Sequence, residues 1–408
     1  MSSEIEGPAG PGSTPHDGRR SSSPPGELDC IITLDYELPA GGRGDVRQHM
    51  LQPTEKLLEV CERHGAKLTI LAELGEIWAF EDERNAGYGK SLGYDPVAEI
   101  ERQLVATVSR GHDVQLHLHP QWLGARWSPN GWELDYERYQ LGSLDRAEAV
   151  AVLRRGREWL EQRLGAVMPE YACLGFRAGN WNIEPAAFYF SVLREAGLRA
   201  DSSIFKWGYA DTGAVTFDYR AAFSNLRAWY LRTGDLSQPG ESDGLLEVPI
   251  AALRVSPLRM LTWTRLKRAF RYVREDLEVR EAVAGQGSST TRPRSSRWRT
   301  WLTPRAKKLD FCKLSGREML SMLRTFRAQL DGSPPDPVGG DPFAGDAPVP
   351  MVMIGHSKQL GAEKNLAQFL RSASEVCDGS LRFSTYREFV QKYTRQSAGV
   401  EEKQAEFT

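Results

Sequence analysis

Apolar runs and amphipathic stretches alternate along most of the chain. The runs LDCIITLDYEL, AKLTILAEL and DVQLHL are short and mostly apolar, which is typical of strands. Between them apolar residues recur at helical spacing, and Gly65 and Gly111 follow these stretches, as expected where helices end. Asp95 and Pro96 predict the N-cap and the first turn of the second of these helices.

The same alternation continues through the rest of the chain. Further strands are predicted in ACLGFRAGNW, LRADSSIF, LLEVPIAAL and PMVMIGHSK, and helices over 144–164, after Pro185, over 317–330 and over 362–376. Strands that alternate with helices predict a parallel sheet covered by helices, and the number of units favours a barrel over an open sheet. We therefore predict an α/β fold, a distorted (β/α)-barrel with long loop insertions and with polar residues at the carboxyl ends of its strands.

Segments of different composition flank and interrupt this pattern. Residues 1–26 are rich in Gly, Pro and Ser, so we expect a disordered tail, then one barrel domain over 27–395 and a disordered tail over 396–408. Inside the domain we expect a Pro- and Gly-rich loop over 331–350 and a basic insert over about 282–309. The insert has no acidic residue and carries Arg292, Arg294, Arg297, Arg299, Arg305, Lys307 and Lys308 around Trp298 and Trp301.

The basic insert has two interpretations. A charge run is most often a solvated, mobile loop. With its tryptophans, the segment over 292–308 could instead make peripheral contact with a membrane, through phosphate-bearing head groups, or hold an anionic glycan or nucleic acid. The formal net charge of the chain is only −2, so we expect no nucleic-acid partner.

The cysteines and the lack of long apolar runs bear on location. Five cysteines are scattered, odd in number and free of CxxC spacing, which argues against a disulfide framework and a thiolate zinc site. No apolar run approaches the roughly 18 residues of a membrane-spanning helix, and the first thirty residues lack a secretory signal pattern. We expect a soluble protein in the reducing cytoplasm.

The segment HDVQLHLHP carries the first candidate chemistry. By strand alternation His117 and His119 point to the same side, and Pro120 ends the strand beside them. Two imidazoles presented together suit a divalent metal such as zinc, although two polar residues on a wet strand face would give the same pattern. In TLDYE, Asp35 and Glu37 also share a strand face, which adds one or two metal ligands and a carboxylate to act as a base.

Three further motifs place polar residues at predicted strand ends. Arg177 in GFRAGNW is a fixed cation that could orient a carboxylate, Asp201 lies in ADSSIF, and His356 follows an apolar strand in MIGHSK. Each has a common structural alternative: a surface ion pair, a turn residue and a hydrogen-bonded histidine. Tryptophans stand beside three of the motifs, and they would either stack on sugar rings or pack the barrel mouth: Trp122, Trp181 and Trp207.

In order and approximate spacing, the series TLDYE, HLHP, FRAGNW, DSSIF and IGHSK resembles the five motifs of the polysaccharide deacetylases, the NodB-like carbohydrate esterases of family 4. The resemblance spans roughly Leu28 to Tyr393 and is greatest to the branch typified by the lipopolysaccharide biosynthesis protein WalW, which shares the shortened HxHP motif. It implies a seven-stranded distorted (β/α)-barrel, one divalent metal ion and hydrolysis of an N-acetyl or O-acetyl group on a sugar. Zinc is the first candidate for the metal.

The resemblance also implies roles for individual residues. Asp35 matches the general base, and His117 and His119 match the two metal-binding histidines. Arg177 matches the arginine that holds the base. Asp201 matches the acid that tunes the final histidine of the family. His356 matches that histidine, which protonates the leaving group.

The first motif departs from the family pattern. Tyr36 stands where the family has a metal-binding aspartate, and alternation suggests that Glu37 replaces it. The leading hypothesis is a metal-dependent deacetylase of a cell-envelope glycan or lipid-linked sugar precursor. The alternatives are an amidohydrolase-like metalloenzyme, disfavoured because its histidines belong to the first strand, and a sugar-binding pseudoenzyme that lost hydrolysis.

Overall fold

The fold is taken from a computed structural model that describes residues 27–39, 41–84, 86–212, 215–240, 244–256, 305–332 and 348–405. The strands of the principal sheet are β1 (Leu28–Tyr36), β2 (Leu68–Glu73), β3 (Asp113–Leu118), β6 (Gly175–Ala178), β7 (Ala200–Asp201), β10 (Trp229–Arg232), β11 (Asp235–Pro239), β12 (Leu246–Glu247), β15 (Val349–His356) and β16 (Leu381–Phe383). The α-helices in these ranges are α1 (Gln52–Arg63), α2 (Leu74–Glu83), α3 (Gly87–Leu92), α4 (Pro96–Ser109), α5 (Arg146–Leu164), α6 (Ala186–Glu195), α10 (Gly316–Gly332), α11 (Ala362–Val376) and α12 (Tyr386–Ala405).

Seven parallel strands form the centre of the molecule. They lie in the order β15, β1, β2, β3, β6, β7 and β12. The sheet curls, and a single parallel bridge between Ile250, just after β12, and Val352 of β15 joins its two edges. The backbone N–H of Ala251 donates to the carbonyl of Val352 at 3.0 Å across this seam. The predicted distorted (β/α)-barrel is confirmed, with a closure that depends on isolated bridges.

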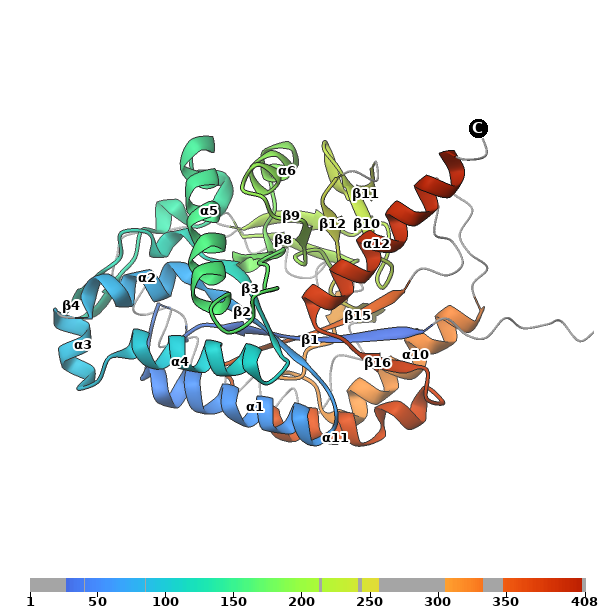
Figure 1. Cartoon of the computed structure of the whole chain (residues 1–408), viewed down its shortest axis with the longest axis horizontal. Coiled ribbons are helices and arrows are strands. Elements are labelled where there is room, and N and C mark those ends of the chain that lie inside the picture. Colours follow the sequence, from blue (N-terminus) through green and yellow to red (C-terminus); the bar gives the residue numbers. More distant parts are fainter. Residues whose placement is uncertain are drawn as a thin grey trace, which may run out of the picture.

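Burial on both faces explains why the central strands are almost continuously apolar. Every residue of β1, β2 and β15 is buried, because one face of each strand packs into the barrel and the other packs under helices. Figure 1 shows α1, α10 and α11 along one side of the strands and α5 and α6 along the other. The predicted start of α4 is also confirmed, since the Asp95 side chain caps this helix by accepting from the N–H groups of Val97 and Ala98.

Several short elements were not predicted from the sequence. The helix α2 begins directly after β2, where Glu73 caps it by accepting from the Gly75 N–H. Three two-stranded sheets project from the central fold: β4 (Arg126–Ser128) with β5 (Gly131–Glu133), β8 (Gly208–Asp211) with β9 (Thr216–Tyr219), and β13 (Ala252–Val255) with β14 (Arg305–Lys308). One π-helical turn, η1 (Arg47–Leu51), and the 3-10 turns η2 (Pro120–Trp122), η3 (Tyr136–Arg138), η4 (Leu141–Ser143) and η5 (Gly179–Trp181) complete the connections.

The tail and insert predictions have different outcomes. The helix α12 continues to Ala405, and the expected C-terminal tail over 396–408 stays a prediction. Glu401, Glu402, Lys403, Gln404 and Ala405 are all strong helix formers and extend the helix that begins at Tyr386. The N-terminal tail, most of the Pro- and Gly-rich loop and the basic insert up to residue 304 lie outside the described residues. Within the described ranges no helix combines the length and apolar character needed to cross a membrane.

Candidate metal centre and active site

Five strands deliver the candidate site residues to the carboxyl end of the barrel. Asp35 lies near the end of β1, while Tyr36 points the other way and its hydroxyl donates to Gln103 at 2.8 Å. His117 belongs to β3, and His119 follows that strand just before Pro120. Arg177 lies in β6, Asp201 ends β7, and His356 ends β15. The parallel register thus carries residues from distant parts of the chain to one end of the barrel.

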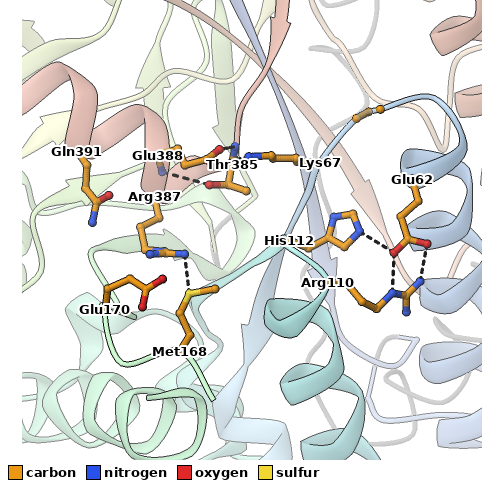
Figure 2. A pocket seen from close by; sticks show the side chains of 13 residues that line it. Glu62, Lys67, Arg110, His112, Met168, Glu170, Thr385, Arg387, Glu388 and Gln391 are labelled. Atoms are coloured by element: carbon orange, nitrogen blue, oxygen red, sulfur yellow. Dashed lines mark hydrogen bonds and ion pairs between the residues drawn. The ribbon is translucent and has the colours of Figure 1, made fainter. Parts of the chain in front are cut away.

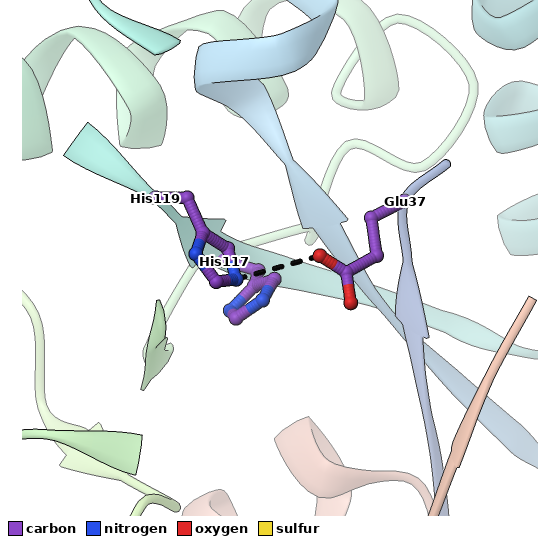
Figure 3. A group of neighbouring side chains, drawn as sticks. All are labelled: Glu37, His117 and His119. Atoms are coloured by element: carbon purple, nitrogen blue, oxygen red, sulfur yellow. Dashed lines mark ion pairs between the residues drawn. The ribbon is translucent and has the colours of Figure 1, made fainter. Parts of the chain in front are cut away.

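Three of these side chains form a compact group. One ligand atom each from Glu37, His117 and His119 lies within 4.8 Å of the other two, and Figure 3 shows the carboxylate facing both imidazole rings. Glu37 Oε2 is 3.4 Å from Nε2 of His119. Alternation across β1 therefore brings Glu37, and not Tyr36, beside the histidine pair, as the sequence predicted.

The ring of His117 is held by its backbone surroundings. Its Nδ1 lies 2.8 Å from the carbonyl oxygen of Arg177, so Nδ1 carries the proton and donates to that carbonyl. Nε2 is then the ring nitrogen left to bind a cation. An imidazole oriented in this way by a carbonyl is the usual arrangement of a metal-binding histidine.

His119 is held by a neighbouring amide. The Nδ1 of His119 is 3.1 Å from Nε2 of Gln121, while the Oε1 of Gln121 is buried without a partner in the described structure. A 180° turn of the amide places Oε1 against Nδ1, where it accepts the Nδ1 proton and leaves the Nε2 lone pair toward Glu37. Burial, the largest cause, lowers the pKa of His119 to about 3, so this imidazole is neutral at pH 7.

Glu37 has a second partner that the sequence did not suggest. The ammonium of Lys358 donates to its Oε1 at 2.7 Å. Burial by itself would raise the pKa of Glu37, but Lys358 and His119 outweigh burial and hold that pKa below its ordinary value. The carboxylate is therefore charged, with one oxygen on Lys358 and the other toward the histidines.

The donor set of this group fits a divalent cation. Two neutral imidazole nitrogens and one carboxylate oxygen are the ligands of many catalytic zinc sites, which keep a further position for water or substrate. The unpaired Oε1 of Gln121 also fits a cation site. If this oxygen accepts the proton on Nδ1 of His119, the Nε2 lone pair of His119 is left for a cation. Among the described residues, this is the one group of three or more histidine, cysteine and acidic side chains that meets such spacing.

Asp35 lies beside this group in a buried ion pair. Its Oδ1 accepts from Nη1 of Arg177 at 2.7 Å, and the same Nη1 donates to the hydroxyl of Thr33 at 3.0 Å. Burial opposes ionisation, but Arg177, with help from His356, outweighs it and lowers the pKa of Asp35. Asp35 is thus a charged carboxylate in a dry site, able to accept a proton.

His356 lies near the carboxylate oxygen of Asp35 that Arg177 does not contact. Its Nε2 is 3.5 Å from Oδ2 of Asp35, because β1 and β15 pair with these two residues in register. Its Nδ1 is buried and has no hydrogen-bond partner among the described residues. Burial, the largest cause, lowers the pKa of His356 to about 4, although Asp35 opposes this shift.

Asp201 belongs to a buried hydrogen-bonded group with Ser203 and Glu247. The backbone N–H of Ser203 donates to Oδ2 of Asp201 at 2.9 Å, and the hydroxyl of Ser203 donates to Oδ1 at 2.9 Å. Asp201 also shares a hydrogen bond with the buried Glu247 of β12. Nδ1 of His356 has no hydrogen-bond partner in the described structure, and the predicted tuning of His356 by Asp201 stays a prediction. Asp201 and Glu247 are register partners between β7 and β12.

The three tryptophans have three different surroundings. Trp122 is 5% exposed and its ring packs against Phe80 and Trp132, which agrees with the packing alternative, while its predicted role in binding sugar stays a prediction. Trp181 stands edge-on to His356 with ring centres 6.2 Å apart and stays a candidate. The backbone N–H of Trp207 donates to Tyr219, and the hairpin of β8 and β9 begins beside it. Its predicted role in binding remains a prediction.

Sequence reasoning missed several titratable residues at the site. Glu73 ends β2 with Oε2 4.0 Å from Nε2 of His117, and burial raises its pKa well above the ordinary value. Burial likewise raises the pKa of Glu76 to about 8, even though the Leu38 N–H donates to it at 2.9 Å. Lys358 follows His356 by two residues in the motif IGHSK, which was the available signal. Lys308 belongs to the predicted basic insert.

A hollow lies at the other end of the strands. Figure 2 shows its charged lining, which encloses about 570 Å³. Its three permanent cations all have acidic partners: Arg110 contacts Glu55 and Glu62, Lys67 contacts Glu388, and Arg387 contacts Asp113. The residues before β2 and β3 line it, so it lies away from the group around Glu37. Such paired charges are typical of a structural ion-pair network.

Comparison with known proteins supports the fold. A Parabacteroides distasonis protein named as a glycoside hydrolase/deacetylase aligns with a TM-score of 0.51 and 12% identity, over 92% of this chain and 73% of that chain. The two chains share one fold.

Two further solved structures are named as polysaccharide deacetylases. The Mycobacterium smegmatis protein aligns with a TM-score of 0.45 and 14% identity over 96% of each chain. The Pseudomonas aeruginosa PAO1 protein aligns with a TM-score of 0.44 and 12% identity, over 91% of this chain and 92% of that chain. No family model matches the chain, and no curated protein matches it.

Proposed function

We propose that this protein is a metal-dependent hydrolase that removes an acetyl group from a sugar. The observation that carries the proposal is the juxtaposition of two sets of side chains at one end of the barrel. Glu37, His117 and His119 form the candidate cation site, and the charged Asp35 lies beside them, held by Arg177. The Parabacteroides distasonis protein of the same fold, which is named as a glycoside hydrolase/deacetylase, supports the same class of reaction.

Each side chain has a role in the proposed reaction. A divalent cation, zinc first, would be held by Glu37, His117 and His119, and when bound it would polarise the acetyl carbonyl and make a water molecule more acidic. Asp35 is placed to accept a proton from the attacking water, because it is charged and has no proton of its own. Arg177 keeps Asp35 in place and ionised.

His356 is proposed as the acid that protonates the leaving nitrogen or oxygen. With its pKa at about 4, it is neutral at pH 7 and must first gain a proton. Asp35 is the nearest source, because Oδ2 is 3.5 Å from Nε2 of His356. The proton that Asp35 takes from water can therefore pass to His356 and then to the leaving group.

The proposal also covers the class of substrate and the cellular location of the protein. We propose a cell-envelope polysaccharide or a lipid-linked lipopolysaccharide precursor, deacetylated on the cytoplasmic side. The five cysteines are all buried and unpaired, which suits a reducing compartment. The predicted membrane or glycan contact of the basic insert concerns mainly residues 292–304, outside the described ranges.

One observation favours a second candidate, a glycan-binding protein without hydrolysis. Lys358 occupies one oxygen of Glu37 at 2.7 Å, and Tyr36 faces away from the site where the resembling family has a ligand. A cation must then bind a carboxylate that an ammonium already shares. If the Lys358 ammonium keeps Glu37 from binding a cation, the protein could bind a sugar but could not hydrolyse it.

Metal analysis and turnover separate the two candidates. The parent protein and a His117→Ala/His119→Ala double variant are incubated with zinc, dialysed and measured by elemental analysis. About one equivalent in the parent and none in the double variant supports the metalloenzyme. Asp35→Asn should keep the metal and lose at least about 100-fold in turnover of an acetylated sugar. Absence of metal and turnover in the parent would favour the binding protein.

A further inference from the structure

One lysine of the site has no role in the proposed reaction. Lys308 ends β14, which pairs with β13 so that Lys308 lies opposite Ala252. Its ammonium lies 2.9 Å from the ring centre of Trp181 and 4.5 Å from that of Phe205. Trp181 in turn stands edge-on to His356, 6.2 Å away. Lys308 and the proposed acid thus contact the same tryptophan from two directions.

Lys308 differs from the other cations around the reaction centre. Arg177 is paired with Asp35, and Lys358 is paired with Glu37. Within the described residues, no carboxylate lies within ion-pair distance of the Lys308 ammonium. Its neighbour Lys307, on the other face of the strand, is bonded to Glu318 at 3.2 Å.

The surroundings of Lys308 are unfavourable to a charge without a partner. Burial, and after it Lys313, lowers the pKa of Lys308 well below the ordinary value, while Asp310 and Asp35 act in the opposite direction. Contact with the face of Trp181 compensates for only part of the lost hydration. An anion bound at this ammonium would supply the missing partner and restore its charge.

Resting on the proposed function, we infer that Lys308 binds a carboxylate or phosphate group carried by the sugar, so that the substrate is an acidic acetylated glycan. The geometry places this group on the side of the leaving group, because His356 and Lys308 flank Trp181. The ring of Trp181 then limits how far the sugar can move between them. A purely structural lysine would stabilise Trp181 without distinguishing acidic from neutral sugars.

Binding of matched sugars tests the inference. Isothermal titration calorimetry on the full-length, zinc-treated protein compares N-acetylglucosamine with two acidic relatives, N-acetylmuramic acid and N-acetylglucosamine 1-phosphate. The parent should bind at least one acidic sugar about tenfold more tightly than the neutral sugar, the effect of one charged hydrogen bond. Tighter binding of one acid alone identifies carboxylate or phosphate as the recognised group.

Variants at adjacent positions separate recognition from nonspecific charge effects. Lys308→Met should abolish the preference for the acidic sugar, Lys308→Arg should keep much of it, and Lys307→Met, which removes the same charge from the other strand face, should leave it unchanged. Equal affinities for acidic and neutral sugars in the parent, or a preference that survives Lys308→Met, would overturn the inference. Circular dichroism of each variant confirms that the fold is intact.

The binding experiment does not depend on turnover. If the parent deacetylates no sugar and Lys308→Met still removes an acidic preference, the proposed function fails and the inference about Lys308 holds. If the parent deacetylates neutral and acidic sugars with equal kcat/KM and binds them equally, the function holds and the inference fails.

Discussion

Arg177 and Asp35 form an ion pair of 2.7 Å between Nη1 and Oδ1 with both side chains almost completely buried. Removal of the guanidinium leaves a carboxylate in a dry site without its principal partner. Arg177→Met should therefore lower the free energy of unfolding by about 3–5 kcal/mol, as measured by urea denaturation. The exposed pair of Arg220 and Asp218 provides the control, since Arg220→Met should cost less than about 1 kcal/mol. Equal losses in the two variants would show that Arg177 does not stabilise Asp35.

The ammonium of Lys358 bears on metal binding. It lies 2.7 Å from Oε1 of Glu37, where it shares a proposed ligand and repels a second cation. Lys358→Met should raise the affinity for zinc about tenfold, because the relief of this repulsion exceeds the lost hydrogen bond. Titration against a fluorescent zinc chelator measures the change, with the exposed Lys90→Met as control. Weaker zinc binding in Lys358→Met would instead show that Lys358 orients Glu37.

Gly179 allows the close approach of His119 to β6. A Cβ atom at Gly179 would lie 2.7 Å from Nδ1 of His119 and 2.9 Å from the carbonyl oxygen of Leu118. Gly179→Ala should displace the ring and weaken zinc binding by about 10- to 100-fold. Gly234 has open space around it, so Gly234→Ala should bind zinc as the parent does. Unchanged zinc affinity in Gly179→Ala would mean that His119 is not a ligand.

The buried Glu76 predicts a pH-dependent stability. Burial raises its pKa from 4.5 to about 8 in the folded protein, so the folded state keeps a proton that the unfolded state releases. Stability should fall as pH rises through this window, by up to ~1.4 kcal/mol per pH unit. Glu76→Gln removes this contribution and should be more stable than the parent by a few kcal/mol above pH 8, with little difference near pH 4.5.

Urea denaturation of the two proteins across this pH range, with a chelator present, tests the role of Glu76. The exposed Glu59→Gln variant should follow the parent curve. Parallel pH profiles for Glu76→Gln and the parent would contradict the raised pKa.

Local periodicity determined much of the fold. The strands and helices that the sequence predicted are present because apolar runs and helical spacing act within one segment. The alternation of side chains along a strand also predicted that Asp35 shares a face with Glu37, and His117 with His119. Short segments without a clear period, such as α2 and the hairpin of β8 and β9, were not predicted, because periodicity needs several repeats to be recognised.

Contacts between segments were decided by the tertiary structure. The register of β1 and β15 sets Asp35 beside His356, and the register of β7 and β12 sets Asp201 beside Glu247. Neither Lys358 on Glu37 nor Lys308 on Trp181 follows from spacing along the chain. The sequence by itself determined which residues share a strand face, because alternation is local. Strand register and barrel curvature decided which faces meet, because they arise from packing of the whole chain.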